Sequence, residues 1–117
     1  TAQSIYENRV GDALSLAKEA LVTFRKAGDM QGRMSALSTV VEAHLALNDA
    51  FAALLVASDE LAMIKRSGDK SAQLKALDLV ANTQLAKGDG VGALSTTEEW
   101  VALAKELGEK EPEAKAL

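Results

Sequence analysis

Few residues of this chain have the type and spacing that catalysis requires. His44 is the only histidine, and a histidine that acts as a general base needs a nucleophile or an orienting carboxylate beside it. Glu42 lies two residues away and would point to another side of a helix. We therefore predict that His44 has a structural role in helix packing.

The glycine-rich segment Gly88-Asp89-Gly90-Val91-Gly92 is suggestive of a phosphate-binding loop. It follows a predicted helix instead of a strand and lacks the acidic residue that such a loop has downstream, so we interpret it as a turn between helices. Cysteine is absent, which excludes a thiolate zinc site and a cysteine nucleophile. The scattered aspartates lack the alternating pattern of calcium ligands. We predict no catalytic residue, no cofactor and no metal, and hence no enzyme.

Short turn motifs recur along the chain with a period of forty residues. One series is Gly28-Asp29, Gly68-Asp69 and Gly108-Glu109, and a second series, halfway between, is Asn48-Asp49 and Gly88-Asp89. A glycine can take the left-handed conformation that closes a helix, and the following aspartate can accept hydrogen bonds from the free N–H groups of the next helix. The motifs therefore predict helical hairpins that repeat every forty residues.

The segments between these turns carry apolar residues at helical spacing. One stripe is Ala13, Leu14, Ala17, Leu21 and Phe24, and it recurs as Ala53, Leu54, Ala57, Leu61 and Ile64. The predicted helices cover residues 10–27, 30–47, 50–67, 70–87 and 91–107, with helix stubs at 1–7 and 111–117. Gly90 and Gly92 are poor helix formers, so we expect the helix over 91–107 to start late. The whole chain, residues 1–117, is predicted to be one all-α domain, excerpted from something longer.

Composition narrows the class of partner. Hydrophobic residues make up 48% of the chain and aromatic residues only 3%, so the core must be built from alanine, leucine and valine. The net charge of −4 and the pI of about 5.0 argue against binding to nucleic acid or to an anionic membrane surface. There is no apolar run of about 20 residues and no signal-peptide pattern, so we predict a cytoplasmic protein with no membrane span.

The sizes of residues at repeated positions resemble the tetratricopeptide repeat family in a longer, forty-residue form. Leu37, Val40 and Val41 fall on the family's large, large, small triplet, which Leu77, Val80 and Ala81 repeat; Ala53 and Ala57, then Ala93 and Thr97, fall on core positions of the second helix. The resemblance covers nearly the whole chain. It implies a right-handed α-α superhelix, a solenoid of antiparallel helical hairpins. Glu60 and Trp100 depart from it, because they stand where alanine is common.

The resemblance also implies a concave groove that the first helix of each hairpin lines. Its candidate residues are Ser38, Glu42, Leu45, Lys75, Asp78, Asn82 and Leu85. Some members of this family hold a terminal carboxylate with lysine and asparagine side chains, and the acids Glu42 and Asp78 do not fit that role. An apolar strip flanked by acids better suits a peptide or helix with apolar and basic residues.

We therefore predict a non-catalytic scaffold that binds a protein or peptide in this groove. Two alternatives stay open: structural spacer repeats within a larger multi-repeat protein, or a regulatory sensor arm beside a nucleotide-binding switch domain. The apolar faces of the two stubs predict self-association through the repeat ends. Trp100 is expected to lie beneath residues 111–117. The cations at Arg25-Lys26, Lys65-Arg66 and Lys105 are interpreted as compensation of helix dipoles.

Overall fold

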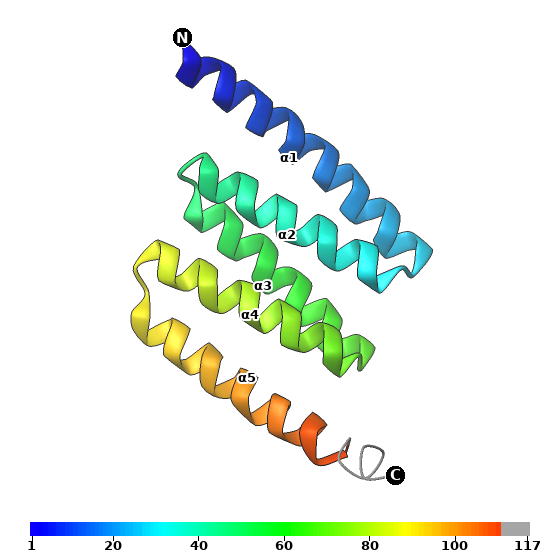
Figure 1. The fold of residues 1–117 in the computed structure, drawn as a ribbon. Coiled ribbons are helices and arrows are strands. Elements are labelled where there is room, and N and C mark those ends of the chain that lie inside the picture. The colour runs from blue at the N-terminus through cyan, green and yellow to red at the C-terminus, as the bar shows by residue number, and fades with distance from the viewer. Residues whose placement is uncertain (111–117) are drawn as a thin grey trace.

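Over residues 1–110 the protein is a row of five α-helices joined by short turns (Figure 1). The structure, a computed structural model, describes residues 1–110, and the side chains of residues 1–108. The helices are α1 (Ala2–Ala27), α2 (Met30–Ala46), α3 (Ala50–Ser67), α4 (Lys70–Lys87) and α5 (Gly90–Lys110). The prediction of an all-α fold is therefore confirmed, and α3 and α4 span the residues predicted.

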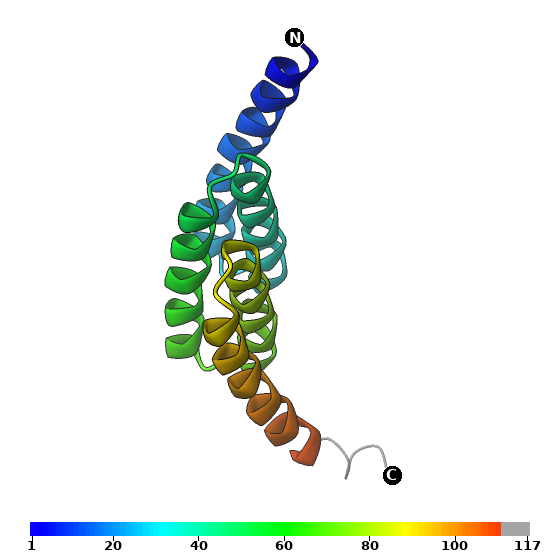
Figure 2. The same cartoon turned by 90° about the vertical axis from the view of Figure 1, so that its left-hand side faces the viewer.

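Consecutive helices run in opposite directions, and each packs mainly against its neighbour in sequence. In addition, α2 packs against α4, the helix forty residues further on. Seen from the side, α3 lies in one layer and α2 with α4 in another (Figure 2). The chain is elongated, with extents of 58 × 35 × 24 Å.

All four turns between the helices have the geometry that the repeated motifs predict. Gly28, Gly68 and Gly88 are left-handed, with φ between 73° and 88°, and Asn48 takes the same role with a φ of 60°. The aspartate after each one accepts a hydrogen bond from a backbone N–H three residues later, at 2.8 to 3.0 Å. These aspartates are Asp29, Asp49, Asp69 and Asp89.

The predicted break between a stub at 1–7 and a helix at 10–27 is wrong, because α1 is continuous from Ala2 to Ala27. In the forty-residue register, Asn8 and Arg9 correspond to Asn48 and Asp49. Arginine has no oxygen acceptor with which to cap the next helix, so nothing favours a turn at this point.

The bounds predicted for the last helix, 91–107, are also wrong. α5 begins at Gly90, since Asp89 caps it despite its two glycines. It also continues through Gly108 to Lys110. Forty residues after the capping Asp69 the chain has Glu109 instead of an aspartate. Residues 111–117, predicted as a further stub, lie outside the described residues. The expected cover of Trp100 by that segment lies there too; within the described part, the Trp100 side chain is 38% exposed.

The core runs through the middle of the row. Its largest fully buried apolar side chains are Leu37, Val40, Ile64 and Leu77, packed around small residues such as Ala53 and Ala57. Alanine at these positions lets neighbouring helices approach closely, which explains how a core almost free of aromatic rings reaches full burial. The outer helices contribute less: Leu16 on α1 and Val91 and Leu94 on α5 are exposed.

Candidate functional site

The structure places all seven candidate groove residues on α2 and α4, the two helices that lie side by side. Three of them, Ser38, Lys75 and Asp78, line one hollow of about 420 Å³, together with Gln31, Met34, Ser35 and Leu79. Ser38 is half-buried, whereas Lys75 and Asp78 are exposed. Hydroxyl, ammonium and carboxylate groups are thus available at one place for hydrogen bonds to a bound chain.

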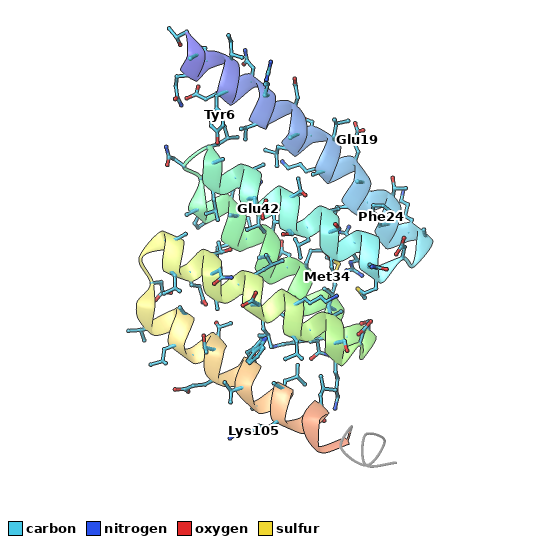
Figure 3. All side chains as sticks on the ribbon, in the orientation of Figure 1. Tyr6, Glu19, Phe24, Met34, Glu42 and Lys105 are labelled. Carbon is cyan, nitrogen blue, oxygen red and sulfur yellow. The ribbon has the colours of Figure 1, made fainter. Side chains whose placement is uncertain are left out.

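The other four candidates lie further along the same helices and do not line this hollow. Glu42, Asn82 and Leu85 are exposed and Leu45 is half-buried, and the Leu85 side chain is 60% accessible. Figure 3 shows Glu42 and Met34 toward different ends of α2. The candidates therefore form two groups, one in the hollow and one toward the turns that follow α2 and α4.

A second hollow, of about 250 Å³, continues the first toward the beginning of α4. It is lined by Met30, Gln31, Met34, Asp69, Ser71, Ala72 and Lys75, so that Gln31, Met34 and Lys75 belong to both hollows. Met34 is buried and provides an apolar floor between polar side chains. We call the two hollows together the α2–α4 groove.

Sequence reasoning missed Gln31 and Met34 as groove residues. Gln31, Ser35 and Ser38 are spaced by four and three residues, which places them on one side of a helix. This spacing could have extended the groove to the start of α2, but the resemblance emphasised positions nearer the end of that helix.

His44 is buried in α2 and lines neither hollow of the groove. Burial lowers the pKa of its imidazole below the ordinary 6.5, and the charge of Lys18 on α1 lowers it further, while Asp49 raises it. The neutral imidazole is therefore the favoured form in the folded protein.

A buried acid, Glu60 of α3, joins three helices. Its side chain accepts a hydrogen bond from Arg33 Nε of α2 at 2.8 Å and a second one from Arg25 of α1. Glu60 is 1% exposed and Arg33 is also buried. The carboxylate thus has a cationic partner on each of two helices, which offsets the cost of removing it from water.

A similar ion pair links α3 to α5. Lys65 Nζ lies 3.1 Å from Glu99 Oε1, and both side chains are partly exposed. Arg25 and Lys65 are forty residues apart and so occupy equivalent positions of the repeat. Each pairs with an acid two helices further along the chain. Sequence reasoning favoured compensation of helix dipoles over a basic ridge for an acidic partner, and it missed these ion pairs because pairing between helices so far apart leaves no local pattern.

Nothing in the described part of the chain resembles a metal centre. Within residues 1–110, no group of three or more histidine, aspartate or glutamate side chains could hold a metal ion. None of the five helices in this part is long and apolar enough to cross a membrane.

No protein-family model matches this chain, and no curated protein matches it either.

Proposed function

We propose that this chain is a non-catalytic interaction scaffold that binds a peptide or a partner helix along the α2–α4 groove. The observation that carries the proposal is the contact between α2 and α4, which brings Ser38, Lys75 and Asp78 from two repeats into one open hollow. Repeats that stack in this way create surfaces longer than any single repeat provides.

The groove chemistry favours a partner with apolar and basic residues. Met34 offers an apolar floor, Leu85 an exposed apolar side chain, and Glu42 and Asp78 two exposed carboxylates. Serine and glutamine side chains such as Ser38 and Gln31 can both donate and accept hydrogen bonds, which suits the backbone of an extended peptide. The net charge of −4 also favours a partner with basic residues.

We also propose that the helical hairpins of this chain are tetratricopeptide-like repeats. Packing between sequential helices, with an added contact between α2 and α4, supports a stack of hairpins, and the resemblance implies that this stack forms a right-handed superhelix. In such an arrangement α2 and α4 line the concave side. We infer a cytoplasmic protein whose partner is another protein and not a nucleic acid or a membrane.

A peptide library with apolar and basic sequences tests the groove. Every peptide that binds should lose affinity for the variant with Glu42→Lys and Asp78→Lys by about tenfold, equivalent to roughly 1.4 kcal/mol, because two attractive carboxylates become repulsive cations. The measurement is fluorescence anisotropy with labelled peptides.

A matched control carries the same change in net charge elsewhere. Asp12→Lys with Glu98→Lys alters two exposed acids on α1 and α5 and should leave affinity nearly unchanged. Equal losses in both variants would reduce the effect to non-specific charge attraction. A library without any binder would instead favour the structural spacer.

A further inference from the structure

A hollow of about 420 Å³ lies between α1 and α3, with α2 at its base. We call it the α1–α3 pocket. Val40 of α2 is fully buried and Val22 of α1 is 42% exposed, so the pocket extends from the core to the surface. Its apolar lining comes from all three helices: Leu21, Val22, Val40, Val56 and Met63. None of these residues lines the α2–α4 groove.

A helix that precedes α1 in the chain would not close this pocket. By the forty-residue repeat, such a helix stands to α1, α2 and α3 as α2 stands to α3, α4 and α5. Within the described residues, α2 packs against α3 and α4 but not against α5. The equivalent contact with α3 is therefore missing, and the α1–α3 pocket stays open to a ligand.

The size of the pocket suits a small molecule. Small-molecule sites in proteins occupy roughly 300 to 1,000 Å³, and the volume of about 420 Å³ lies in this range. An α-helix about 10 Å wide fills a similar volume with a single turn of about 5.4 Å. The α1–α3 pocket therefore has no room for the several turns that a partner helix would present.

Two side chains of opposite charge lie at the edge of the pocket without a partner. Lys18 of α1 and Asp59 of α3 line it, and both are exposed. Within residues 1–108, neither side chain forms an ion pair, whereas the other two charged residues of the lining, Arg25 and Glu60, pair with each other. A ligand with an anionic and a cationic group can therefore form two charge-assisted hydrogen bonds here.

The later repeat shows why Asp59 lacks a cation. Lys65 and Glu99 form an ion pair between α3 and α5, and the residues forty positions earlier are Arg25 and Asp59. Arg25 pairs with Glu60 instead. Glu60 is buried, and a buried carboxylate depends on a cation far more than an exposed one does. The Asp59 carboxylate therefore remains available to a cation that a ligand brings.

The remaining lining favours an aromatic ring as the apolar part of the ligand. Arg25 and Met63 both border the pocket. A guanidinium group is attracted to the face of an aromatic ring, and a methionine sulfur makes favourable contacts with the edge of one. An aliphatic chain would gain from burial alone. The pocket thus combines sites for a ring, an anion and a cation.

We propose that the α1–α3 pocket binds a small aromatic zwitterion of the kind that a free aromatic amino acid represents. Its ring packs against Val40 and Met63, its carboxylate pairs with Lys18, and its ammonium group pairs with Asp59. This site is separate from the α2–α4 groove and does not depend on the function proposed for that groove.

The experiment titrates the intact chain with three compounds that share an indole ring. Tryptophan carries both charges, tryptamine lacks the carboxylate, and indole-3-propionate lacks the ammonium group. NMR spectra of the methyl groups of Val22, Val56 and Met63 report on the pocket. Tryptophan should shift these signals and should bind about tenfold more tightly than either of the other two compounds.

Single variants assign each charge of the ligand to a residue. Lys18→Met should weaken tryptophan about tenfold and leave tryptamine unchanged, because tryptamine has no carboxylate to lose a partner. Asp59→Asn should weaken tryptophan equally and leave indole-3-propionate unchanged. Lys26→Met and Asp12→Asn are the matched controls, since both remove an exposed charge outside the pocket. They should leave the binding of all three compounds unchanged.

The outcomes separate this proposal from its rivals. Absence of methyl shifts, equal affinities for the three compounds, or equal effects of a variant and its control would overturn it. N-acetyltryptophanamide has the indole without either charge and resembles tryptophan within a peptide; if it binds as tightly as tryptophan, the occupant is a side chain of a partner protein and the proposal is wrong. Glu42→Lys with Asp78→Lys in the α2–α4 groove should not affect tryptophan binding, so the two proposals can fail separately.

Discussion

The Glu60 carboxylate is buried between cations from α1 and α2. A buried ion pair of this kind adds little stability compared with well-packed apolar residues, yet removal of one partner leaves the other charge without compensation. The Arg33 side chain is 11% exposed, whereas that of Arg25 is 37% exposed and can turn to water. Arg33 is therefore the partner that depends on Glu60.

Glu60→Leu should lower the free energy of unfolding by roughly 3 to 5 kcal/mol, since Arg33 then keeps a buried charge. The double variant Arg33→Met with Glu60→Leu should recover most of that loss. Urea denaturation measures both. For comparison, Lys65→Met with Glu99→Leu removes a partly exposed pair and should change stability by about 1 kcal/mol or less. A double variant no better than Glu60→Leu alone would contradict this account.

His44 should make stability depend on pH near neutrality. Its pKa in the folded protein lies below the ordinary 6.5, so the unfolded chain takes up a proton first as the pH falls. Stability is therefore full above about pH 6.5 and decreases as the pH falls through that value. His44→Gln, which copies Gln84 of the following repeat, should remove this component. The measurement is the free energy of unfolding of both proteins between pH 7.5 and 5.5; a constant difference across that range would show that His44 does not titrate differentially.

At the level of helices, the presence of a capping aspartate decides where the chain turns. Asp29, Asp49, Asp69 and Asp89 each cap a helix, whereas Arg9 and Glu109 occupy the same register and lie inside α1 and α5. A short carboxylate can reach back to the N–H groups of its own first turn, but arginine has no acceptor and glutamate is longer. The forty-residue repeat could be recognised in the sequence. The predicted break in α1 and the predicted end of α5 at residue 107 were wrong because the period was extended to positions that lack a capping aspartate.

This explanation predicts that a turn can be installed in α1. Asn8→Gly with Arg9→Asp should break α1 at residues 8–9, because the cap contributes about 1 kcal/mol and glycine lowers helix stability by a similar amount. Residues 1–9 are exposed, so little packing opposes the break. NMR Cα chemical shifts should lose their helical values over residues 2–7. Arg9→Glu is the control and should leave the helix continuous; unbroken helical shifts in the double variant would refute the capping argument.

At the scale of the whole molecule, the packing of each helix against its neighbours in sequence could be predicted, because these contacts are close in the chain. Turn motifs and apolar stripes fix each hairpin locally, and hairpins joined by two or three residues have few ways to pack. Ser38 and Asp78 could be assigned to one groove because they occupy equivalent positions of α2 and α4 in the forty-residue repeat. The partners of Glu60 could not be predicted, since Arg25 lies 35 residues away on a helix that is not its neighbour.

The network around Glu60 also bears on how such a chain can lengthen during evolution. A duplication of residues 30–69 would copy Arg33 and Glu60 but not Arg25, which lies before the duplicated segment. Lys65 of the first copy occupies the register position of Arg25, so it would stand next to the new Glu60 and supply the missing charge. Gene duplication can therefore add a forty-residue unit to this protein without leaving a buried acid unpaired, even though the ion network itself crosses the boundary of every unit.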